Sequence, residues 1–403
     1  MTNLFSMIKK QGITYLFFVV IALCHFQKGM AQNISSKWID QNLEEAAAQY
    51  KVMMQTVPDG LMPATYQHDS LKTNTSASWV AGFYPGTLLY LYEGTGNKNF
   101  YNEAMKKIVL MDDQQYNPNT HDLGFMMYCS YGNLYRIEPK EKYKEILLNS
   151  AHSLASRFNP KAGCIRSWGK PDDTTQFRVI IDNMMNLELL MWTFQASGDS
   201  SLYKVAVTHA NTTMKNHFRP DYSSFHVVVY NPQTGEILRK QTAQGAADES
   251  AWARGQSWGL YGYTMMYRFT KDKRYLDQAQ HIASFILNNP HLPSDKIPYW
   301  DYDAPGIPNT YRDASSGAII ASALIELSTY SNKDLSKKYL SVVETILRSL
   351  SSPEYKAAVG TNGGFLLKHS MGNFNKNNQV DAPLPYADYY YVEALLRYKN
   401  LLK

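Results

Sequence analysis

The sequence predicts an all-α protein, an (α/α)6 barrel with a small β-hairpin excursion. Two observations lead to this fold: amphipathic segments recur along the chain, and segments that are apolar on nearly every face alternate with them. An amphipathic helix covers a core with one face, whereas a helix that lacks a polar face is buried on most sides. About six helices of each kind therefore indicate two concentric rings.

The outer ring is expected from five segments in which a polar turn precedes apolar residues at helical spacing. Each segment carries a tyrosine at an equivalent position: Tyr101, Tyr143, Tyr203, Tyr275 and Tyr339. The intervals between them are 42, 60, 72 and 64 residues. An earlier segment, "NLEEAAAQYKVMMQ", would complete this outer set.

The inner ring is expected from six segments rich in small and aromatic residues: "VAGFYPGTLLYLYEGTG", "LGFMMYCSYGNLYRI", "NMMNLELLMWTFQAS", "ARGQSWGLYGYTMMYRFT", "SSGAIIASALIELSTY" and "PYADYYYVEALLRYKNLL". Strand signals are sparse, and the best one, "SSFHVVVYNPQTGEILRKQT", predicts a hairpin around "NPQTG". No linker or break in composition interrupts residues 32–403, so we expect a single domain there.

Residues 1–31 have the features of a secretory signal peptide. Lys9 and Lys10 precede the apolar run "ITYLFFVVIALCHF", and the small residues of "GMAQ" suit cleavage after Ala31. No other segment is apolar enough to cross a bilayer. We therefore expect an exported protein, located in the periplasm and without a membrane span.

Composition excludes several classes of function. The formal charge of +5 falls to about +2 without the three lysines of the signal segment, which argues against a nucleic-acid partner. There is no HExxH, no CxxC and no glycine-rich phosphate loop, so neither a metal nor another cofactor is expected. Outside the signal segment only Cys129 and Cys164 remain, too few for a disulfide scaffold. The oligomeric state is not predicted.

Acidic residues precede three of the inner helices: Asp122 in "HDLG", Asp182 in "IDN" and Asp313 in "RDASSG". Each of them alone would make a good helix N-cap. In an α/α barrel, however, the inner helices are parallel, so their N-termini and these acids converge on one mouth. Two carboxylates with different pKa values suit glycosidic bond cleavage. Apolar neighbours favour a raised pKa and an acid role for Asp182, whereas the more open Asp122 suits substrate binding or charge stabilisation.

Other polar and aromatic residues allow two interpretations each. Arg254 lies at a helix start, where the helix dipole disfavours a cation. It would either clamp a substrate carboxylate or tie the hairpin to the barrel. Trp79, Trp168 and Trp258 would either stack on sugar rings or pack in the core. The loop "LLKHSMGNFNKNN" would either contact sulfate or the next sugar through Lys368, Ser370 and Asn373, or be a solvated loop.

Several motifs resemble those of the unsaturated glucuronyl hydrolases, glycoside hydrolase family 88: "SWVAGFYPG", "HDLGF", "IIDNMMNLELL", "SSFHVV", "ARGQSWGLYGY" and "DASSGAIIASAL". They extend from Trp79 to about Tyr390. The resemblance implies an (α/α)6 barrel in which Asp182 is the general acid and base and Asp122 holds sugar hydroxyls. It also implies substrate-binding roles for His121, Trp79, Trp168, His226, Gln244, Arg254 and Trp258.

The resemblance further implies an unusual reaction on oligosaccharides that lyases have produced. A 4,5-unsaturated uronic acid would leave the non-reducing end, in particular of glycosaminoglycan disaccharides, after hydration of its C4=C5 bond. Three alternatives remain open: an unsaturated rhamnogalacturonyl hydrolase acting on pectin fragments, a catalytically silent sugar-binding toroid, and a sugar epimerase. Retention of both Asp122 and Asp182 argues against the silent toroid, and an epimerase would use histidine pairs. The sugar at the reducing side and its sulfation are not predicted.

Overall fold

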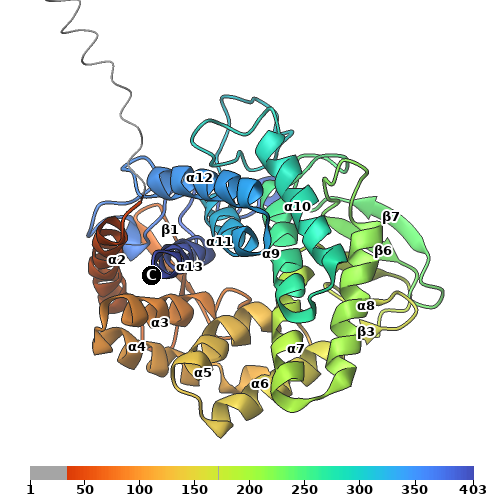
Figure 1. Ribbon diagram of the computed structural model, residues 1–403. Helices are drawn as coiled ribbons and strands as arrows, with labels where there is room; N and C mark the ends of the chain where they lie inside the picture. The colour runs from red at the N-terminus through yellow and green to blue at the C-terminus, as the bar shows by residue number, and fades with distance from the viewer. Residues whose placement is uncertain (1–33, 171) are drawn as a thin grey trace, which may run out of the picture. The chain divides into compact units, whose positions relative to one another are not determined.

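Helices of two kinds alternate along the chain in the computed structural model, which describes residues 34–170 and 172–403. The outer helices are α2 (Ser36–Thr56), α4 (Lys98–Val109), α6 (Glu141–Ala155), α8 (Ser200–Asn216), α10 (Lys273–Asn288) and α12 (Lys333–Leu350). The inner helices are α3 (Phe83–Thr95), α5 (Asn133–Ile137), α7 (Asn183–Ser197), α9 (Ala253–Thr270), α11 (Ala314–Tyr330) and α13 (Pro385–Leu401). Figure 1 shows these helices arranged around a ring. The predicted signal peptide, residues 1–31, lies outside the described residues.

The inner helices close on themselves. α3 packs against η2, the helical segment Gly124–Gly132 that leads into α5, and η2 packs against α7. α7 then contacts α9, α9 contacts α11, α11 contacts α13, and α13 returns to α3. This closed ring inside a ring of outer helices is an (α/α)6 barrel, which confirms the predicted fold.

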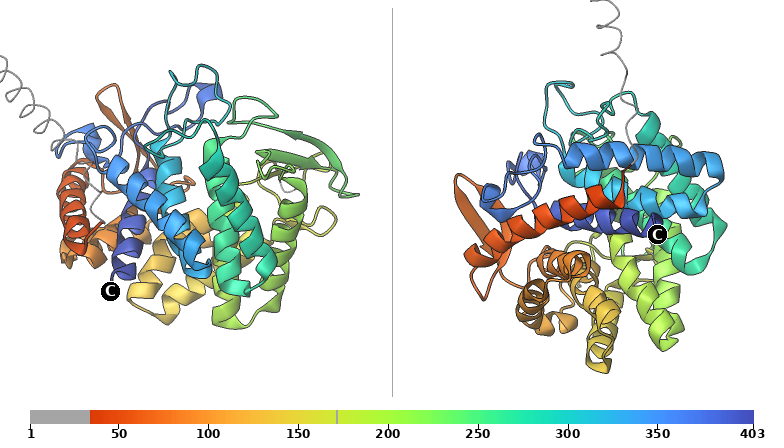
Figure 2. Two further views of the ribbon diagram at one scale, coloured as in Figure 1. Left: turned by 45° about the horizontal axis from the view of Figure 1, so that its top comes forward. Right: turned by 60° about the vertical axis from the view of Figure 1, so that its left-hand side comes forward.

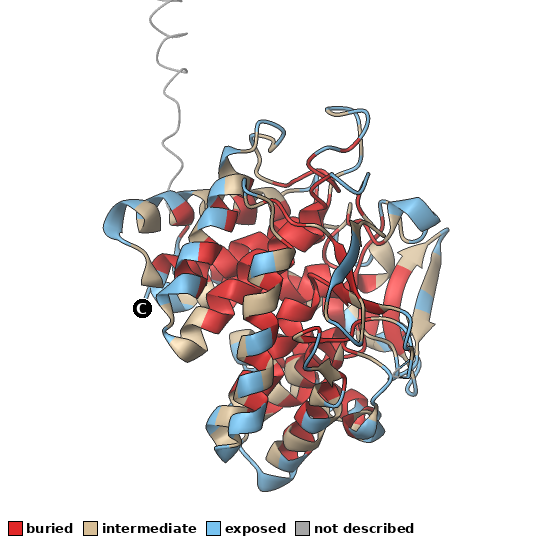
Figure 3. Cartoon of the chain, turned by 90° about the vertical axis from the view of Figure 1, so that its right-hand side faces the viewer, coloured by how far each residue is buried: buried red, intermediate tan, exposed pale blue. Residues whose placement is uncertain are grey.

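Burial separates the two rings as the sequence pattern predicts (Figure 3). α11 is apolar or small along its length and is buried on nearly all faces. α12 instead buries one stripe, formed by Tyr339, Val343, Ile346, Leu347 and Leu350. Steps of three and four residues place such a stripe on one face of a helix, so the rest of α12 is left to solvent.

The polar turns before the outer helices act as N-caps. The side chain of Asn97 accepts a hydrogen bond from the Asn99 N–H at the start of α4, and Asp199 does the same at α8. Asp272 and Asn332 cap α10 and α12 in the same way. These caps satisfy N–H groups that have no partner inside the helix, and they set where each outer helix begins.

A three-stranded antiparallel sheet lies beside the helices, as the left view of Figure 2 shows. Its strands are β5 (Phe177–Ile180), β6 (Val227–Tyr230) and β7 (Ile237–Gln241). β6 and β7 form the predicted hairpin around "NPQTG". β5, which the sequence analysis read as part of the run into α7, instead pairs with β6. Strand β5 therefore ends two residues before Asp182.

The remaining strands are short. β1 (Met62–Gln67) pairs with β2 (Ser70–Asn74), and β3 (Phe158–Asn159) pairs with β4 (Cys164–Ile165). Cys164 in β4 and Cys129 in η2 are both buried and free. Within the part of the chain that the structure describes, no helix combines the length and apolar character that a membrane span needs.

Candidate active site

One mouth of the barrel, where the inner helices begin, contains a cavity of about 190 Å³. Eight residues of the predicted site line it: Trp79, His121, Asp122, Trp168, Asp182, Gln244, Arg254 and Asn373. Four others that were predicted, His226, Trp258, Lys368 and Ser370, do not line it. The convergence expected from parallel inner helices therefore brings most of the predicted residues together.

A close approach of two inner helices connects the two candidate acids. A Cβ on Gly124, at the start of η2, would lie 2.4 Å from the Cα of Asn186 in α7, so only glycine fits there. Asn186 Oδ1 accepts a hydrogen bond of 3.0 Å from the Phe125 N–H. Asp122 lies two residues before Gly124, and Asp182 lies one helical turn before Asn186. This contact therefore helps to bring Asp122 and Asp182 into the same cavity.

Asp182 occupies the N-cap position of α7, but its side chain forms no capping hydrogen bond. The residue is 9% exposed, and its Oδ2 accepts no hydrogen bond from any described residue. Burial raises the pKa of Asp182 to about 7, with a further contribution from the charge of Asp122. Arg254 and Trp258 act in the opposite direction without cancelling the rise. The Asp182 carboxyl therefore does not cap the helix, and its pKa suits a group that both donates and accepts a proton.

Asp122 is held from two sides. The Thr120 hydroxyl donates to Asp122 Oδ2 at 3.3 Å, and His121 Nε2 lies 3.4 Å from Oδ1. Burial lowers the pKa of His121, which keeps this imidazole neutral. With a side chain that is 17% exposed, Asp122 presents a carboxylate to the cavity and can accept hydrogen bonds from sugar hydroxyls.

His226 lies behind Asp182 and has a fixed tautomer. Its Nδ1 accepts hydrogen bonds from the backbone N–H groups of Ala243, at 3.1 Å, and Gln244, at 3.2 Å. The ring proton must therefore be on Nε2, which lies 3.7 Å from Asp182 Oδ2. Burial lowers the pKa of His226 to about 3, so it is a neutral donor aimed at the acid. His226 therefore lies next to Asp182 but does not line the cavity, whereas the resemblance implied contact with the sugar.

Arg254 lines the cavity but already has partners. Its guanidinium donates to the backbone carbonyls of Met371 and Gly372 and to Gln244 Oε1. Nη1 also lies 3.5 Å from a carboxylate oxygen of Asp313. Asp313 itself is fully buried and caps α11 by accepting from the Ser315 N–H. Asp313 is therefore a structural partner of Arg254 and not a third acid in the cavity.

The three tryptophans divide into two groups. Trp79 and Trp168 are half-buried and line the cavity; Trp79 packs against Tyr386 with ring centroids 5.2 Å apart. Trp258 is fully buried beneath them and packs against Phe125, with centroids 5.0 Å apart. Trp258 sits in α9 one turn after Arg254, where its ring faces the barrel interior, so it supports the cavity without forming an open wall.

The loop after η3 (Asn362–Gly364) contributes Asn373 to the cavity, but not Lys368 or Ser370, which were predicted with it. Ser370 is fully buried, and its backbone pairs with Ala382. The chain then turns back on itself through η4 (Phe374–Lys376), where Asn373 and Asn378 exchange backbone hydrogen bonds. This turn, which we call the amide loop, adds Gly372, Asn373, Asn378 and Gln379 to the cavity lining.

Tyr386 and Ile180 also line the cavity, and the sequence analysis did not single them out. Tyr386 follows Pro385 at the first turn of α13. Proline is favoured at the first position of a helix. Tyr386 therefore stands at the start of an inner helix, as Asp122 and Asp182 do, and this position places it at the same mouth of the barrel. Ile180 ends β5 and forms part of the apolar surroundings of Asp182. Among the described residues, no group of His, Cys, Asp and Glu side chains converges as metal ligands would.

Comparisons with known proteins place the chain among relatives of one family. Residues 49–400 match the model of Glycosyl Hydrolase Family 88. The chain is 46% identical over 328 residues to an unsaturated glucuronyl hydrolase of Formosa agariphila, covering 81% of each chain. It is 35% identical over 344 residues to an unsaturated chondroitin disaccharide hydrolase of Streptococcus agalactiae, covering 83% of this chain and 85% of that one.

A solved structure shares the fold throughout. The crystal structure of an unsaturated glucuronyl hydrolase specific for heparin superposes with a TM-score of 0.88 at 48% sequence identity. The superposition covers 92% of this chain and all of the other, so the similarity extends over nearly the whole fold.

Proposed function

Because the chain belongs to glycoside hydrolase family 88, we propose that it removes a 4,5-unsaturated uronic acid from the non-reducing end of lyase-generated glycosaminoglycan disaccharides. The single observation that carries this proposal is Asp182, a buried carboxyl with a pKa of about 7 that caps nothing and faces a sugar-sized cavity. The activities named for the relatives support the choice of substrate class.

In the proposed reaction, protonated Asp182 donates its proton to C4 of the unsaturated ring. C5 then becomes electron-poor and is stabilised by the lone pair of the ring oxygen. The Asp182 carboxylate next takes a proton from water as that water attacks C5. The resulting hemiketal opens, and the glycosidic link to the second sugar breaks by rearrangement. One group that acts first as acid and then as base needs a pKa near the working pH.

The other lining residues are proposed to hold the substrate. Asp122 accepts hydrogen bonds from ring hydroxyls, and His226 keeps Asp182 oriented through its Nε2–H. Trp79 and Trp168 offer ring faces to the sugars. The positive charge of Arg254 and the amides of Gln244 and the amide loop face the uronate carboxylate.

Isotope labelling tests the reaction directly. In heavy-oxygen water we expect the label first at C5, and in deuterated water we expect one deuteron at C4, because hydration adds a proton and water across the double bond. Mass spectrometry and NMR of the products measure both. A saturated glucuronide, which has no double bond, serves as control and should not react. Label at C1 with the double bond intact would instead indicate an ordinary glycosidase with two acids at the anomeric carbon.

The pH dependence of kcat/KM follows from the same group. Because Asp182 must be protonated in the free enzyme, we expect kcat/KM to fall about tenfold per pH unit above about pH 7. Loss of ultraviolet absorbance from the conjugated double bond measures the rate between pH 5 and 9. A rate that stays constant up to pH 9 would mean that another group donates the proton.

The class of polysaccharide from which the substrate derives can also be tested. Unsaturated disaccharides from chondroitin, hyaluronan, heparin and pectin lyases can be compared by kcat/KM under the same conditions. We expect turnover of glycosaminoglycan products, whereas preference for the pectin product would favour the rhamnogalacturonyl alternative.

We further propose that the protein is exported to the periplasm. Support comes from residues 1–31 of the sequence alone, which combine two lysines, a short apolar run and a small-residue cleavage motif. N-terminal sequencing of the protein from its native cells should give a mature chain that starts at Gln32; a chain that retains Met1 in the cytoplasm would contradict export.

A further inference from the structure

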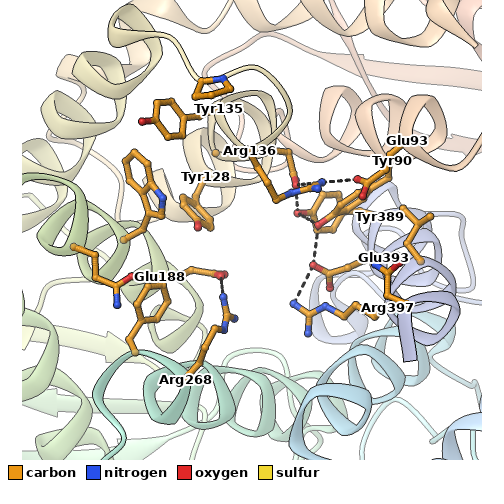
Figure 4. A pocket seen from close by; sticks show the side chains of 18 residues that line it. Tyr90, Glu93, Tyr128, Tyr135, Arg136, Glu188, Arg268, Tyr389, Glu393 and Arg397 are labelled. Carbon is orange, nitrogen blue, oxygen red and sulfur yellow. Dashed lines mark hydrogen bonds and ion pairs between the residues drawn. The ribbon is translucent and has the colours of Figure 1, made fainter. Parts of the chain in front are cut away.

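A second and larger cavity lies at the opposite mouth of the barrel, where the inner helices end (Figure 4). Its volume is about 650 Å³, within the usual range for sites that bind small molecules. The lining comes from the last turns of α3, α5, α7, α9 and α13 and from the end of η2. It shares no residue with the active-site cavity.

The charged groups of this cavity are paired with one another. Arg268 lies 2.7 Å from Glu188, Arg136 lies 2.7 Å from Glu93, and Arg397 lies 3.3 Å from Glu393. Arg268 and Arg397 also pair with Glu326, which does not line the cavity. Every arginine of the cavity therefore has a glutamate partner, and a charged ligand would have to displace one. An anion would also meet the negative ends of the inner-helix dipoles. The electrostatics thus favour an uncharged ligand.

One side of the cavity is an aromatic wall formed by Trp192, Tyr128 and Tyr135. The centroid of Trp192 lies 6.1 Å from that of Tyr128 and 5.1 Å from that of Tyr135. All three rings are half-buried, and the exposed amide of Gln195 adjoins them. Aromatic faces next to donors and acceptors suit a ligand that is apolar on one face and rich in hydroxyls at its edge.

The position of the Tyr128 ring in this aromatic wall depends on Gly132. It has helical dihedral angles, and glycine in a helix costs about 1 kcal/mol relative to alanine. A Cβ at this position would lie 2.7 Å from Cδ2 of Tyr128. Glycine here leaves room for the Tyr128 ring to lie against the backbone. It also ends η2, a π-helix, and π-helical segments occur frequently at functional sites.

We propose that this second cavity binds a neutral pyranose sugar, stacked on Trp192 and hydrogen-bonded at its edge to the tyrosine hydroxyls and Gln195. The size of the cavity, its balanced charges and its aromatic wall together define this ligand class. The proposal does not depend on the reaction assigned to the other mouth.

Binding of methyl β-glucoside and of N-acetylglucosamine tests the proposal by saturation-transfer NMR and calorimetry. We expect saturable binding with a Kd of about 1 mM, typical of a small ligand with one stacked ring. Trp192→Ala and Gly132→Ala should each weaken it by about tenfold or more, because the wall is lost or displaced. Turnover of the unsaturated disaccharide should not change in either variant.

Two controls separate this site from the active site and from general surface effects. Tyr116→Ala removes an aromatic ring that is 67% exposed elsewhere and should leave binding unchanged. Asp182→Asn protein saturated with unsaturated disaccharide should still bind the neutral probe. The proposal would be overturned if no saturable binding were found. It would also be overturned if the disaccharide displaced the probe and Trp192→Ala left binding intact. If Trp192→Ala does not fold, Gln195→Ala and Gly132→Ala provide the same comparison.

Discussion

Asp182→Asn should lower kcat by about 10²- to 10⁴-fold, the usual contribution of a general acid and base, and should leave the fold intact. Asparagine caps a helix as well as aspartate does, so a residue kept only as a cap would tolerate the change. The absorbance assay on an unsaturated disaccharide measures the loss, and circular dichroism checks the fold. The matched control is Asp272→Asn, since Asp272 does cap its helix and lies far from the cavity in sequence and fold. Near-normal turnover in Asp182→Asn would contradict the catalytic assignment.

The same substitution should make the protein more stable in alkaline solution. The folded pKa of Asp182 is raised to about 7, above its value of 3.8 in a free chain. Folding therefore takes up a proton between these two values, and the stability of the wild type falls as the pH rises through this window. Asparagine has no charge to bury. The stability gain of Asp182→Asn over wild type should increase by about 3 kcal/mol from pH 5 to pH 8.

Denaturant unfolding at the two pH values measures this gain. Catalytic groups are often held in environments that cost stability, so a loss of activity together with a gain in stability is the result that distinguishes a functional carboxyl from a structural one. Asp272→Asn should show no such dependence on pH over this window, because the hydrogen bond from the Arg274 side chain holds the pKa of Asp272 below its usual value. An equal pH response in both variants would argue against burial as the cause.

Much of the site could be predicted because it depends on helix starts. Asp122, Asp182 and, by the same rule, Tyr386 each stand at the N-terminus of an inner helix, and parallel packing brings those ends together. Periodicity along the chain is enough to find such positions. The buried environment of Asp182 was also visible in its apolar neighbours.

What could not be predicted depends on contacts between distant segments. The amide loop reaches the cavity because the carbonyl of Gly372 accepts from Arg254 and because Asn375 donates to the Gly245 carbonyl. Those partners lie more than a hundred residues away in the sequence, and no local pattern marks them. The four-residue strand β5 also depends on a contact with another segment, because it forms by pairing with β6. Asn373 was predicted from this loop, but Ser370, three residues before it, was predicted as well and is buried.

Arg254→Met should destabilise the protein by about 3–5 kcal/mol, the usual cost of removing one partner from a buried ion pair. Arg254 is 2% exposed and Asp313 is fully buried, so the variant leaves the Asp313 carboxylate without its neighbouring cation. It also removes the donor to two carbonyls that begin the amide loop. The sequence alone left open whether Arg254 clamps a substrate or ties structural segments together, and these contacts favour a large structural share. Denaturant unfolding measures the loss.

A double-mutant cycle tests the cause of that loss. Arg254→Met combined with Asp313→Asn should recover part of the stability, because the asparagine removes the uncompensated charge and can still cap α11. Arg274→Met is the matched control: the Arg274 side chain is 65% exposed in its pair with Asp272, so its loss should cost no more than about 1 kcal/mol. If Arg254→Met keeps wild-type stability and only KM rises, the guanidinium acts mainly on the substrate. If both stability and KM change, the arginine holds the amide loop in place, and the loop in turn shapes the cavity. We expect this second outcome, because Arg254 contacts Asp313, Gly372 and Gln244.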